Sequence, residues 1–476
     1  MSSSSSSSSS SSLSSSFRGG TNNNNNNGNV GARGGTGGAS SSRRRGTGYE
    51  GPSSSQRREP TNEDWPGHFV EALVTQVAIE ASRSTGRRTA APALATVFLV
   101  CPTWREASRS DHLWHRLTRR IWGRSYLRQN TWRDEYIYWH RTAQNFRLAQ
   151  YAHTILRFDP NEEEGPANGL TCRCITLSDT HLACGFSDGS VRLFHLPTRI
   201  HVSTFRPRTR AMLGQFSRAI TGIVITNNHR LVFGTLVGDI HVALINGPPH
   251  TRRVFEGNAV DDGVLVDFTG CGRWWVGLYA GVPDRAFHIW DSNTEQLISV
   301  GGALTNPDSV RGWQMLIEEN DVLGRIRVTS QESAVACTDT MTMVLDLRNH
   351  GLVIGEEEYE GGLMVSSMDV SNSTYIIVDR QGNASVRRAS TLEELCNFSV
   401  RRGAWHRDRG LIGCMNRGFA LMCTGTVIRV WEIEGGRHLY RLAEQIGEVS
   451  VMVADERHVV ACSGDSTLHL WDFGAQ

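Results

Sequence analysis

The strongest constraint on the fold is a repeat that fills the C-terminal two thirds of the chain. Each copy holds a β-rich run, a polar turn, a second apolar run, a Gly or Asp turn, and an alternating run that usually ends near an aromatic residue. The clearest copies are residues 458–472, 419–432, 181–194 and 273–291. Weaker copies occupy residues 231–244, 335–347 and 375–388. Such a repeat predicts an architecture in which each unit buries its apolar face against the next.

The copies follow one another at a mean spacing of about 46 residues. Two of them end in a Trp-Asp pair, at Trp290-Asp291 and Trp471-Asp472. This pattern resembles the WD-repeat family of β-propellers, in which each repeat of about 40–45 residues forms a four-stranded blade. The Gly-His pair that usually opens such repeats is missing, so these repeats are degenerate. The resemblance implies an all-β, seven-bladed WD-repeat-like propeller over residues 151–476.

Ring closure requires one further strand, because the last copy has only three strand-like runs before residue 473. The seventh blade would otherwise have an open edge, which folded proteins avoid. Residues 153–158 read His-Thr-Ile-Leu-Arg-Phe, have strand-like character and lie just before the first copy. We expect them to form the outermost strand of the seventh blade and to close the ring.

Composition divides the remaining sequence into two parts. Residues 1–60 are runs of Ser, Asn and Gly with scattered Arg, which cannot bury enough apolar surface to offset the entropy of ordering. We expect a disordered tail there. Its Arg triplet at residues 43–45 and Arg pair at residues 57–58 fit a nuclear import signal and equally a solvated basic segment. Residues 61–150 have helical character. These two parts carry net charges of about +5 each, against about −9 for residues 151–476.

The helical part begins with an apolar stripe. Asp64 is a candidate N-cap, and Pro66 suits the first turn of a helix. The stripe recurs at helical spacing and consists of Phe69, Leu73 and Val77, with Val70 and Val74 displaced by one residue. We expect Pro92 to open a second helix over residues 93–100.

A motif follows the second helix: Val100-Cys101-Pro-Thr-Trp104, then Leu113-Trp114. Together with the two helices it resembles the F-box, over residues 65–114. The usual Leu-Pro opening reads Trp65-Pro66 here, and residues 82–91 form an insertion rich in Arg and Ser. The resemblance implies a small α-helical F-box domain at residues 61–116 and a helical linker at residues 117–150.

In the F-box family this domain binds the small adaptor subunit of an SCF-type cullin–RING ubiquitin ligase. The resemblance therefore implies that the following residues bind an adaptor: Trp65, Pro66, Phe69, Leu73, Val77, Leu94, Val97, Val100, Cys101, Trp104, Leu113 and Trp114. The alternative is a helical cap that packs on the propeller and uses the same apolar stripe as its core.

A substrate would bind the propeller. In WD-repeat propellers the loops that enter each blade commonly line the partner-binding face. Several such loops carry Arg and Trp, which are enriched among residues that dominate binding energy. The candidate substrate-binding residues are Arg206, Arg208, Arg210, Trp313, Arg401, Arg402, Trp405 and Arg407. They favour an acidic or phosphorylated partner. The acidic runs at residues 162–164 and 356–358 favour a basic one, and an exposed charged loop is usually only solvated.

Several kinds of chemistry lack the residues they need. All 49 residues in the Lys and Arg total are Arg, which excludes every mechanism that requires a Lys. The 10 Cys include no Cys-x-x-Cys pair, and the 17 His show no metal or triad arrangement. We expect no catalytic residue, no metal and no cofactor, and thus a protein that is not an enzyme. No apolar run approaches the length of about 20 residues that a membrane helix needs.

Across its length the chain is similar to plant regulators of the F-box/WD-repeat family. This resemblance implies a nuclear substrate receptor of a ubiquitin ligase, which controls floral and organ growth by marking transcriptional repressors, such as the PEAPOD group, for degradation. A non-ligase scaffold or transcriptional cofactor in the nucleus is the alternative. Direct nucleic-acid binding through the basic residues 1–150 is not expected, because the propeller is acidic.

Overall fold

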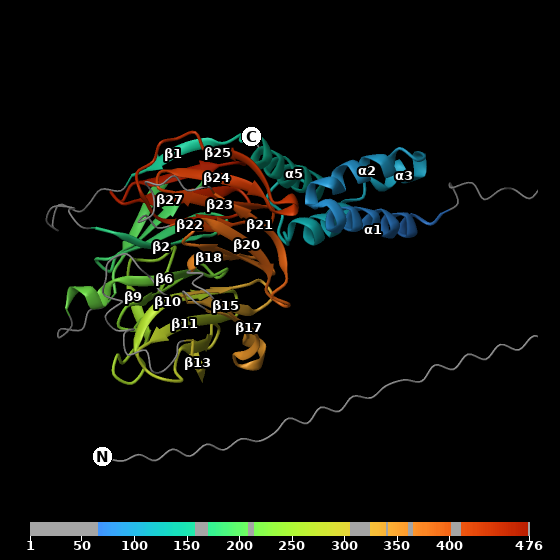
Figure 1. The fold of residues 1–476 in the computed structure, drawn as a ribbon. Coiled ribbons are helices and arrows are strands. Elements are labelled where there is room, and N and C mark those ends of the chain that lie inside the picture. Colours follow the sequence, from blue (N-terminus) through green and yellow to red (C-terminus); the bar gives the residue numbers. More distant parts are fainter. Residues whose placement is uncertain are drawn as a thin grey trace, which may run out of the picture. The chain divides into compact units, whose positions relative to one another are not determined.

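The strands in the described part of the chain form seven four-stranded antiparallel sheets, as the repeat predicts (Figure 1). The computed structural model describes residues 65–157, 170–207, 214–304, 324–338, 341–359, 365–400 and 411–474. The tail predicted at residues 1–60 lies outside the described residues. In six of the sheets the four strands are consecutive in the chain, so each sheet is one blade of a propeller.

The first three blades consist of β2 (Cys172–Leu177), β3 (His181–Phe186), β4 (Val191–His195), β5 (Ile200–Phe205), β6 (Ile220–Ile225), β7 (Arg230–Thr235), β8 (Ile240–Leu244), β9 (Thr251–Phe255), β10 (Val264–Gly270), β11 (Trp274–Ala280), β12 (Phe287–Asp291) and β13 (Gln296–Gly301). The next three consist of β14 (Arg325–Val328), β15 (Ser333–Cys337), β16 (Met341–Asp346), β17 (Leu352–Glu358), β18 (Val365–Ser371), β19 (Thr374–Asp379), β20 (Asn383–Arg388), β21 (Glu394–Ser399), β22 (Leu411–Met415), β23 (Phe419–Thr424), β24 (Val427–Glu432) and β25 (Arg437–Arg441). The seventh contains β26 (Val449–Ala454), β27 (His458–Ser463), β28 (Leu468–Asp472) and β1 (Ala152–Leu156).

The blades form a closed ring. The innermost strands contact their neighbours in the order β2, β6, β10, β14, β18, β22, β26 and back to β2. Apolar side chains fill the space between adjacent blades, and Trp275, Trp290 and Trp471 are fully buried there. The Trp of each Trp-Asp pair is therefore a core residue. The predicted fold class, a seven-bladed propeller preceded by helices, is confirmed.

A strand from the N-terminal side of the propeller completes blade seven. β1 pairs antiparallel with β28, with Ala152 opposite Asp472 and Leu156 opposite Leu468. Leu156 packs with Leu468 and Leu470 in a buried cluster. The closing strand predicted at residues 153–158 is confirmed, although it begins one residue earlier and ends two residues earlier.

Charged side chains from the innermost strands of several blades meet at the centre of the ring. Nη1 of Arg327 on β14 lies 2.6 Å from Oδ2 of Asp267 on β10, and Oδ2 of Asp369 on β18 accepts a hydrogen bond of 3.0 Å from the backbone N–H of Met415. Burial disfavours the charged form of Arg327, but the negative charges of Asp267 and Asp369 outweigh this effect, so the pKa of Arg327 is raised. Burial raises the pKa of Asp369 to about 6, although Arg327 and backbone N–H groups favour its charged form.

Five α-helices precede the propeller in the described part of the chain: α1 (Gly67–Thr85), α2 (Ala90–Phe98), α3 (Pro102–Ala107), α4 (Asp111–Leu117) and α5 (Trp132–Leu148). Short helical turns are η2 (Arg87–Thr89) and η3 (Thr118–Trp122) here, and η4 (Gln215–Arg218), η5 (Leu347–Asn349) and η6 (Ile433–Gly435) in the propeller. None of the helices in the described ranges is long and apolar enough to cross a membrane.

The start of the second helix differs from the prediction. The helix begins at Ala90, three residues before the predicted start, and Pro92 lies in its first turn. Proline is tolerated there because the first backbone N–H groups of a helix have no partner within it. The first helix begins at Gly67 with Pro66 as its N-cap residue. The predicted N-cap, Asp64, lies outside the described residues.

One apolar core joins the predicted F-box segment to the predicted linker. Buried side chains of α1, α2 and α4 pack against Tyr136, Trp139 and Ala143 of α5. Glu135 on α5 is buried, accepts a hydrogen bond from Nε1 of Trp139 and accepts others from the backbone N–H groups of Arg128 and Gln129. The five helices therefore form one packed unit, called here the helical module.

An aromatic stack joins the helical module to the propeller. The ring of Phe146, near the end of α5, stacks on Phe473 at a centroid distance of 3.7 Å and on Phe419 at 5.1 Å. Tyr440 on β25 donates a hydrogen bond to the backbone carbonyl of Phe146, and Nδ2 of Asn145 donates to the carbonyl of Phe473. These contacts fix the end of α5 on blades six and seven.

Arginines of the helical module form ion pairs with propeller carboxylates around this stack. Arg87 lies 2.8 Å from Glu456, and Arg88 pairs with Glu432. Arg124 and Arg128 lie 2.7 Å and 2.8 Å from the two carboxylate oxygens of Asp179 in blade one. Guanidinium groups suit such sites because they present several donors in a rigid plane.

The closing strand should contribute strongly to stability. Leu156 is 3% exposed and Ile155, beside it on β1, is 44% exposed. We expect Leu156→Ala to lower the free energy of unfolding by about 2–5 kcal/mol, because it leaves a cavity between blades one and seven. Urea unfolding followed by Trp fluorescence measures this. The matched control is Ile155→Ala, and equal effects of the two variants would contradict the latching role of Leu156.

The carboxyl of Asp369 should make stability depend on pH. In the folded protein the carboxyl of Asp369 keeps its proton up to about pH 6. In an unfolded chain an Asp carboxyl releases its proton near pH 3.9. The group therefore favours folding below about pH 4, and this contribution is lost as the pH rises to 6. We expect Asp369→Asn to gain stability relative to the wild type over that range. Urea midpoints between pH 4 and 7.5 test this, with the exposed Glu393→Gln as control; a pH-independent difference would refute it.

Candidate interaction surfaces

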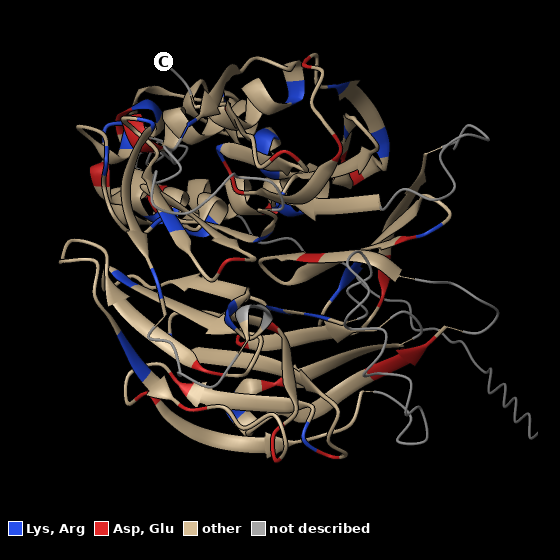
Figure 2. Ribbon diagram, turned by 90° about the vertical axis from the view of Figure 1, so that its left-hand side faces the viewer, with Lys and Arg blue, Asp and Glu red and all other residues tan. Residues whose placement is uncertain are grey.

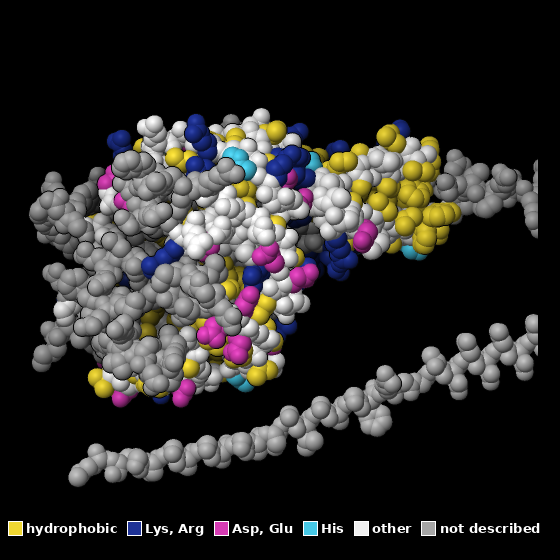
Figure 3. Space-filling model, in the orientation of Figure 1, with side chains coloured by type: hydrophobic (Ala, Val, Ile, Leu, Met, Phe, Trp, Pro, Cys, Tyr) yellow, Lys and Arg dark blue, Asp and Glu magenta, His cyan; other side chains and the backbone are white. Residues whose placement is uncertain are grey.

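Exposed apolar side chains gather at the end of the helical module that is farther from the propeller (Figure 3). Phe69 in the first turn of α1 is 48% exposed, and Leu99 and Val100 between α2 and α3 are 73% and 53% exposed. Trp65 and Leu73 lie half-buried in the same region. We call these five residues the distal patch. Contiguous apolar surface of this kind marks interaction sites, because water disfavours it.

The apolar stripe of α1 has two separate roles. Val70, Val74 and Ala78 are fully buried and form the face of α1 that packs on the other helices. Phe69, Leu73 and Val77 lie one residue away along the helix and are exposed or half-buried. The residues predicted as the main stripe are therefore not the main core face. Val70 and Val74, the members of the stripe displaced by one residue, are core residues, as the alternative of a helical cap also expects.

Local structure holds the distal patch in place. The ring of Trp65 lies 4.9 Å from that of Phe69, edge to face, and 6.0 Å from that of Trp104. Trp104 is buried on α3, which begins with Pro102 directly after the extended residue Cys101. This packing ties the first turn of α1 to α3, so the patch rests on a fixed base.

The structure brings the predicted adaptor-binding residues into one module but distributes them between its core and its surface. Leu94, Trp104, Leu113 and Trp114 are buried. Trp65, Leu73, Val77, Val97 and Cys101 are half-buried, and Pro66, Phe69 and Val100 are exposed. The buried four therefore act in packing; Nε1 of Trp114, for example, donates a hydrogen bond of 2.6 Å to the carbonyl of Ser108. Leu99, the most exposed member of the patch, was not predicted.

The predicted substrate-binding residues lie mostly outside the described part of the chain. This holds for Arg208, Arg210, Trp313, Arg401, Arg402, Trp405 and Arg407. Arg206 is described. Its backbone carbonyl accepts a hydrogen bond of 2.7 Å from Oγ1 of Thr251, and its guanidinium lies 3.9 Å from Asp188.

Acidic residues in segments that connect neighbouring blades have partners within the chain. Oε2 of Glu444 accepts hydrogen bonds from Nε1 of Trp471 and from Tyr151, and Asp262 accepts one from Arg285. The acidic run at residues 356–358 is not a loop. It belongs to the outer strand β17, where Glu357 pairs with Arg387. Charges of both signs are interspersed over the described elements (Figure 2), so these acids do not by themselves favour a basic partner.

Two cations at the centre of the ring lack a neutralising partner among the described residues. Arg173 on β2 and Arg325 on β14 make no hydrogen bond or ion pair there, and Nε of Arg173 is buried. Burial lowers the pKa of Arg325, and the neighbouring Arg327 and Arg173 lower it further against the effect of Asp267. Among the residues that the structure describes, arginines therefore outnumber acidic residues near the centre. Within the described ranges no group of three or more His, Cys, Asp or Glu is arranged to hold a metal ion.

Solved structures with the same fold are distant in sequence. The WD40 repeats of RRP9 superpose with a TM-score of 0.50 at 10% identity, covering 67% of this chain and 97% of that one. U3-55K superposes with a TM-score of 0.50 at 12% identity, covering 67% and 98%. At these identities the likeness shows the propeller fold alone.

Sequence comparison is more specific. No protein-family model matches the chain. The transcriptional regulator Sterile Apetala of Arabidopsis thaliana is 54% identical to it over 432 residues, which are 90% of this chain and 96% of the relative. The match covers nearly the whole of both proteins, so it extends beyond the propeller alone. The chain therefore belongs to the family of the transcriptional regulator Sterile Apetala.

Proposed function

We propose that this protein is the substrate-recognition subunit of an SCF-type cullin–RING ubiquitin ligase. In this proposal the distal patch binds the small adaptor of the ligase, and the propeller binds the protein to be ubiquitinated. The observation that carries the proposal is the exposure of Phe69, Leu99 and Val100 at one end of a module whose other side is anchored to the propeller. The chain itself contributes binding and positioning, and no catalytic group.

The anchoring of the module supports this division of roles. A receptor accelerates transfer by raising the effective concentration of its substrate near the transferase, and this requires a fixed distance between the two sites. The stack of Phe146 and the ion pairs of Arg87, Arg88 and Arg124 supply that rigidity.

The proposed substrates are nuclear transcriptional repressors, such as the PEAPOD group, whose removal would control floral and organ growth. The support is that the Arabidopsis relative is named a transcriptional regulator, together with a propeller fold suited to binding proteins. The nucleus is accordingly the proposed location. Arg173 and Arg325, which form no hydrogen bond or ion pair with other described side chains, favour a substrate that presents acidic groups.

The second candidate function is a nuclear scaffold or transcriptional cofactor that acts without a ligase. The name of the relative and the propeller fold fit this reading equally well. The two candidates differ in what binds the distal patch, so adaptor binding separates them.

Replacing two exposed residues of the patch should weaken adaptor binding without unfolding the protein. Burying an exposed Leu or Phe contributes about 1.5–3 kcal/mol, so Phe69→Ser with Leu99→Ser should weaken binding at least about tenfold. Size-exclusion chromatography of the full chain with a plant cullin-ligase adaptor, followed by calorimetry, measures this.

The matched control is Ile200→Ser on β5, which is also an exposed apolar side chain but lies on the propeller. It should bind the adaptor like the wild type, and all variants should share one thermal midpoint. Trp104 and Trp114 are unsuitable test sites because they are buried and their replacement would disrupt the module. A folded wild type that forms no complex would refute the ligase proposal and favour the scaffold.

A further inference from the structure

Charged side chains from four blades meet at the centre of the propeller, and we call them the central cluster. It consists of Arg173 on β2, Asp267 on β10, Arg325 and Arg327 on β14, and Asp369 on β18. Blades one and four are three places apart in the ring of seven, so β2 and β14 lie on opposite sides of the centre. All three arginines nevertheless act on the pKa of the same thiol, Cys174, although burial dominates and raises that pKa to about 12.

One of these three arginines is neutralised within the cluster. Nη1 of Arg327 lies 2.6 Å from Oδ2 of Asp267 and 2.7 Å from the carbonyl of Ile326. Arg173 and Arg325 form no hydrogen bond or ion pair with other described side chains. Two guanidinium groups are thus held near each other without a counter-ion, although charges away from bulk water are usually paired.

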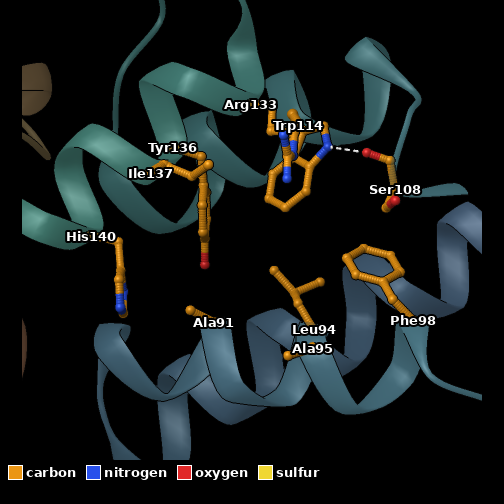
Figure 4. Close-up of a pocket in the computed structure, with 10 residues that line it drawn as sticks. All are labelled: Ala91, Leu94, Ala95, Phe98, Ser108, Trp114, Arg133, Tyr136, Ile137 and His140. Atoms are coloured by element: carbon orange, nitrogen blue, oxygen red, sulfur yellow. Dashed lines mark hydrogen bonds between the residues drawn. The ribbon is translucent and has the colours of Figure 1, made fainter. Parts of the chain in front are cut away.

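The terminal nitrogens of these two arginines can be reached from solvent. Both side chains are half-buried. Nε of Arg173 is closed off, but its two Nη atoms and the nitrogens of Arg325 are not. The depression between α2, α4 and α5 in the helical module is different (Figure 4). Its unpaired polar atoms, Oη of Tyr136 and Nδ1 of His140, are closed to solvent and can meet no ligand.

The two arginines lie toward the face of the propeller that is away from the helical module. Arg325 is the first residue of β14, and Arg173 is the second residue of β2. The innermost strands end on the opposite face, where they lead into the turns that carry Asp179 and Glu456. Those two carboxylates hold the helical module. The unpaired cations are therefore open to a partner while the module stays in place.

The blade structure does not require an arginine at position 173. Arg173 is the bulged residue of β2, because Cys172 and Cys174 on either side of it pair with β3. Bulges of this kind direct a side chain out of the ladder. The same bulge occurs in four other innermost strands, where the bulged residues are uncharged: Thr221, Val266, Ser366 and Ser450.

The charge balance of the cluster favours a carboxylate as the missing counter-ion. Three arginines and two aspartates leave one net positive charge once Asp369, whose pKa burial raises to about 6, has lost its proton. The neighbouring thiol of Cys337 stays neutral, because burial raises its pKa to about 12. A carboxylate balances this charge. A phosphate dianion would leave an excess negative charge beside Asp267 and Asp369.

We propose that the central cluster binds the carboxylate of an Asp or Glu side chain, presented by the protein that the propeller recognises, between the guanidinium groups of Arg173 and Arg325. Each guanidinium can donate two parallel hydrogen bonds to a carboxylate. The inference rests on the proposed role of the propeller in binding a protein. It does not involve the distal patch, so adaptor binding and occupation of the centre can fail separately.

Capped amino acids test the site with the full-length protein at pH 7.5. The first probe is glutamate with an acetylated α-amino group and a methylamide in place of its α-carboxyl group. The matched probe is the glutamine compound, which has nearly the same shape without the charge. Ligand-observed NMR titration should show that the glutamate probe binds the wild type at least about tenfold more tightly, the effect of one charge-assisted hydrogen bond.

Replacing both arginines should remove this preference. In Arg173→Gln with Arg325→Gln the two probes should bind equally, and the thermal midpoint should not fall, because two cations that repel each other are lost. The control is Arg388→Gln, an exposed arginine on β20, which should keep the wild-type preference. The double variant should still bind the adaptor, which separates this test from that of the ligase proposal.

Several results would overturn the proposal. Equal binding of the two probes to the wild type would show that the cluster takes no carboxylate. A preference that survives in the double variant would show adventitious binding to other arginines. Tighter binding of the equally capped phosphoserine would assign the cluster to phosphate. Binding of acetate without binding of the glutamate probe would assign it to a free acid instead of a side chain.

Discussion

The anchoring of α5 on the propeller is the interaction on which the rest of the structure depends. Phe146 packs face to face with Phe473 and Phe419, and only three residues separate the end of α5 from the closing strand β1. The other end of α5 supplies Tyr136 and Trp139 to the core of the helical module. One helix therefore connects the module, the aromatic stack and the strand that completes the ring.

The charged contacts reinforce this anchor at several separate points. Single exposed ion pairs contribute little, but these pairs are largely shielded and reach the propeller from η2 and from the segment after η3. Arg87 and Arg124 also lie over the rings of Trp122 and Trp139, so the same guanidinium groups hold the module together and attach it. A hinge motion between module and propeller would have to break the ion pairs and the arginine–tryptophan contacts at once.

The repeating features of the fold could be predicted from the sequence. Features that depend on how individual side chains pack could not. The propeller and its closing strand follow from periodicity and from the need to pair every edge. Periodicity could not separate Phe69, Leu73 and Val77 from Val70, Val74 and Ala78, because apolar residues at adjacent positions fit two faces of one helix. Leu99 escaped notice because it follows the end of α2.

The pairing of β1 with β28 has a consequence for biosynthesis. The N-terminal partner of this pair emerges from the ribosome more than three hundred residues before the other, and contacts so distant in sequence form slowly. Until β28 is made, β1 has no strand to pair with, and Phe146 has no Phe473 ring to stack on. A nascent or truncated polypeptide would expose an unprotected edge and a loose helix to chaperones and proteases. The ring can therefore close only after the last blade has been made.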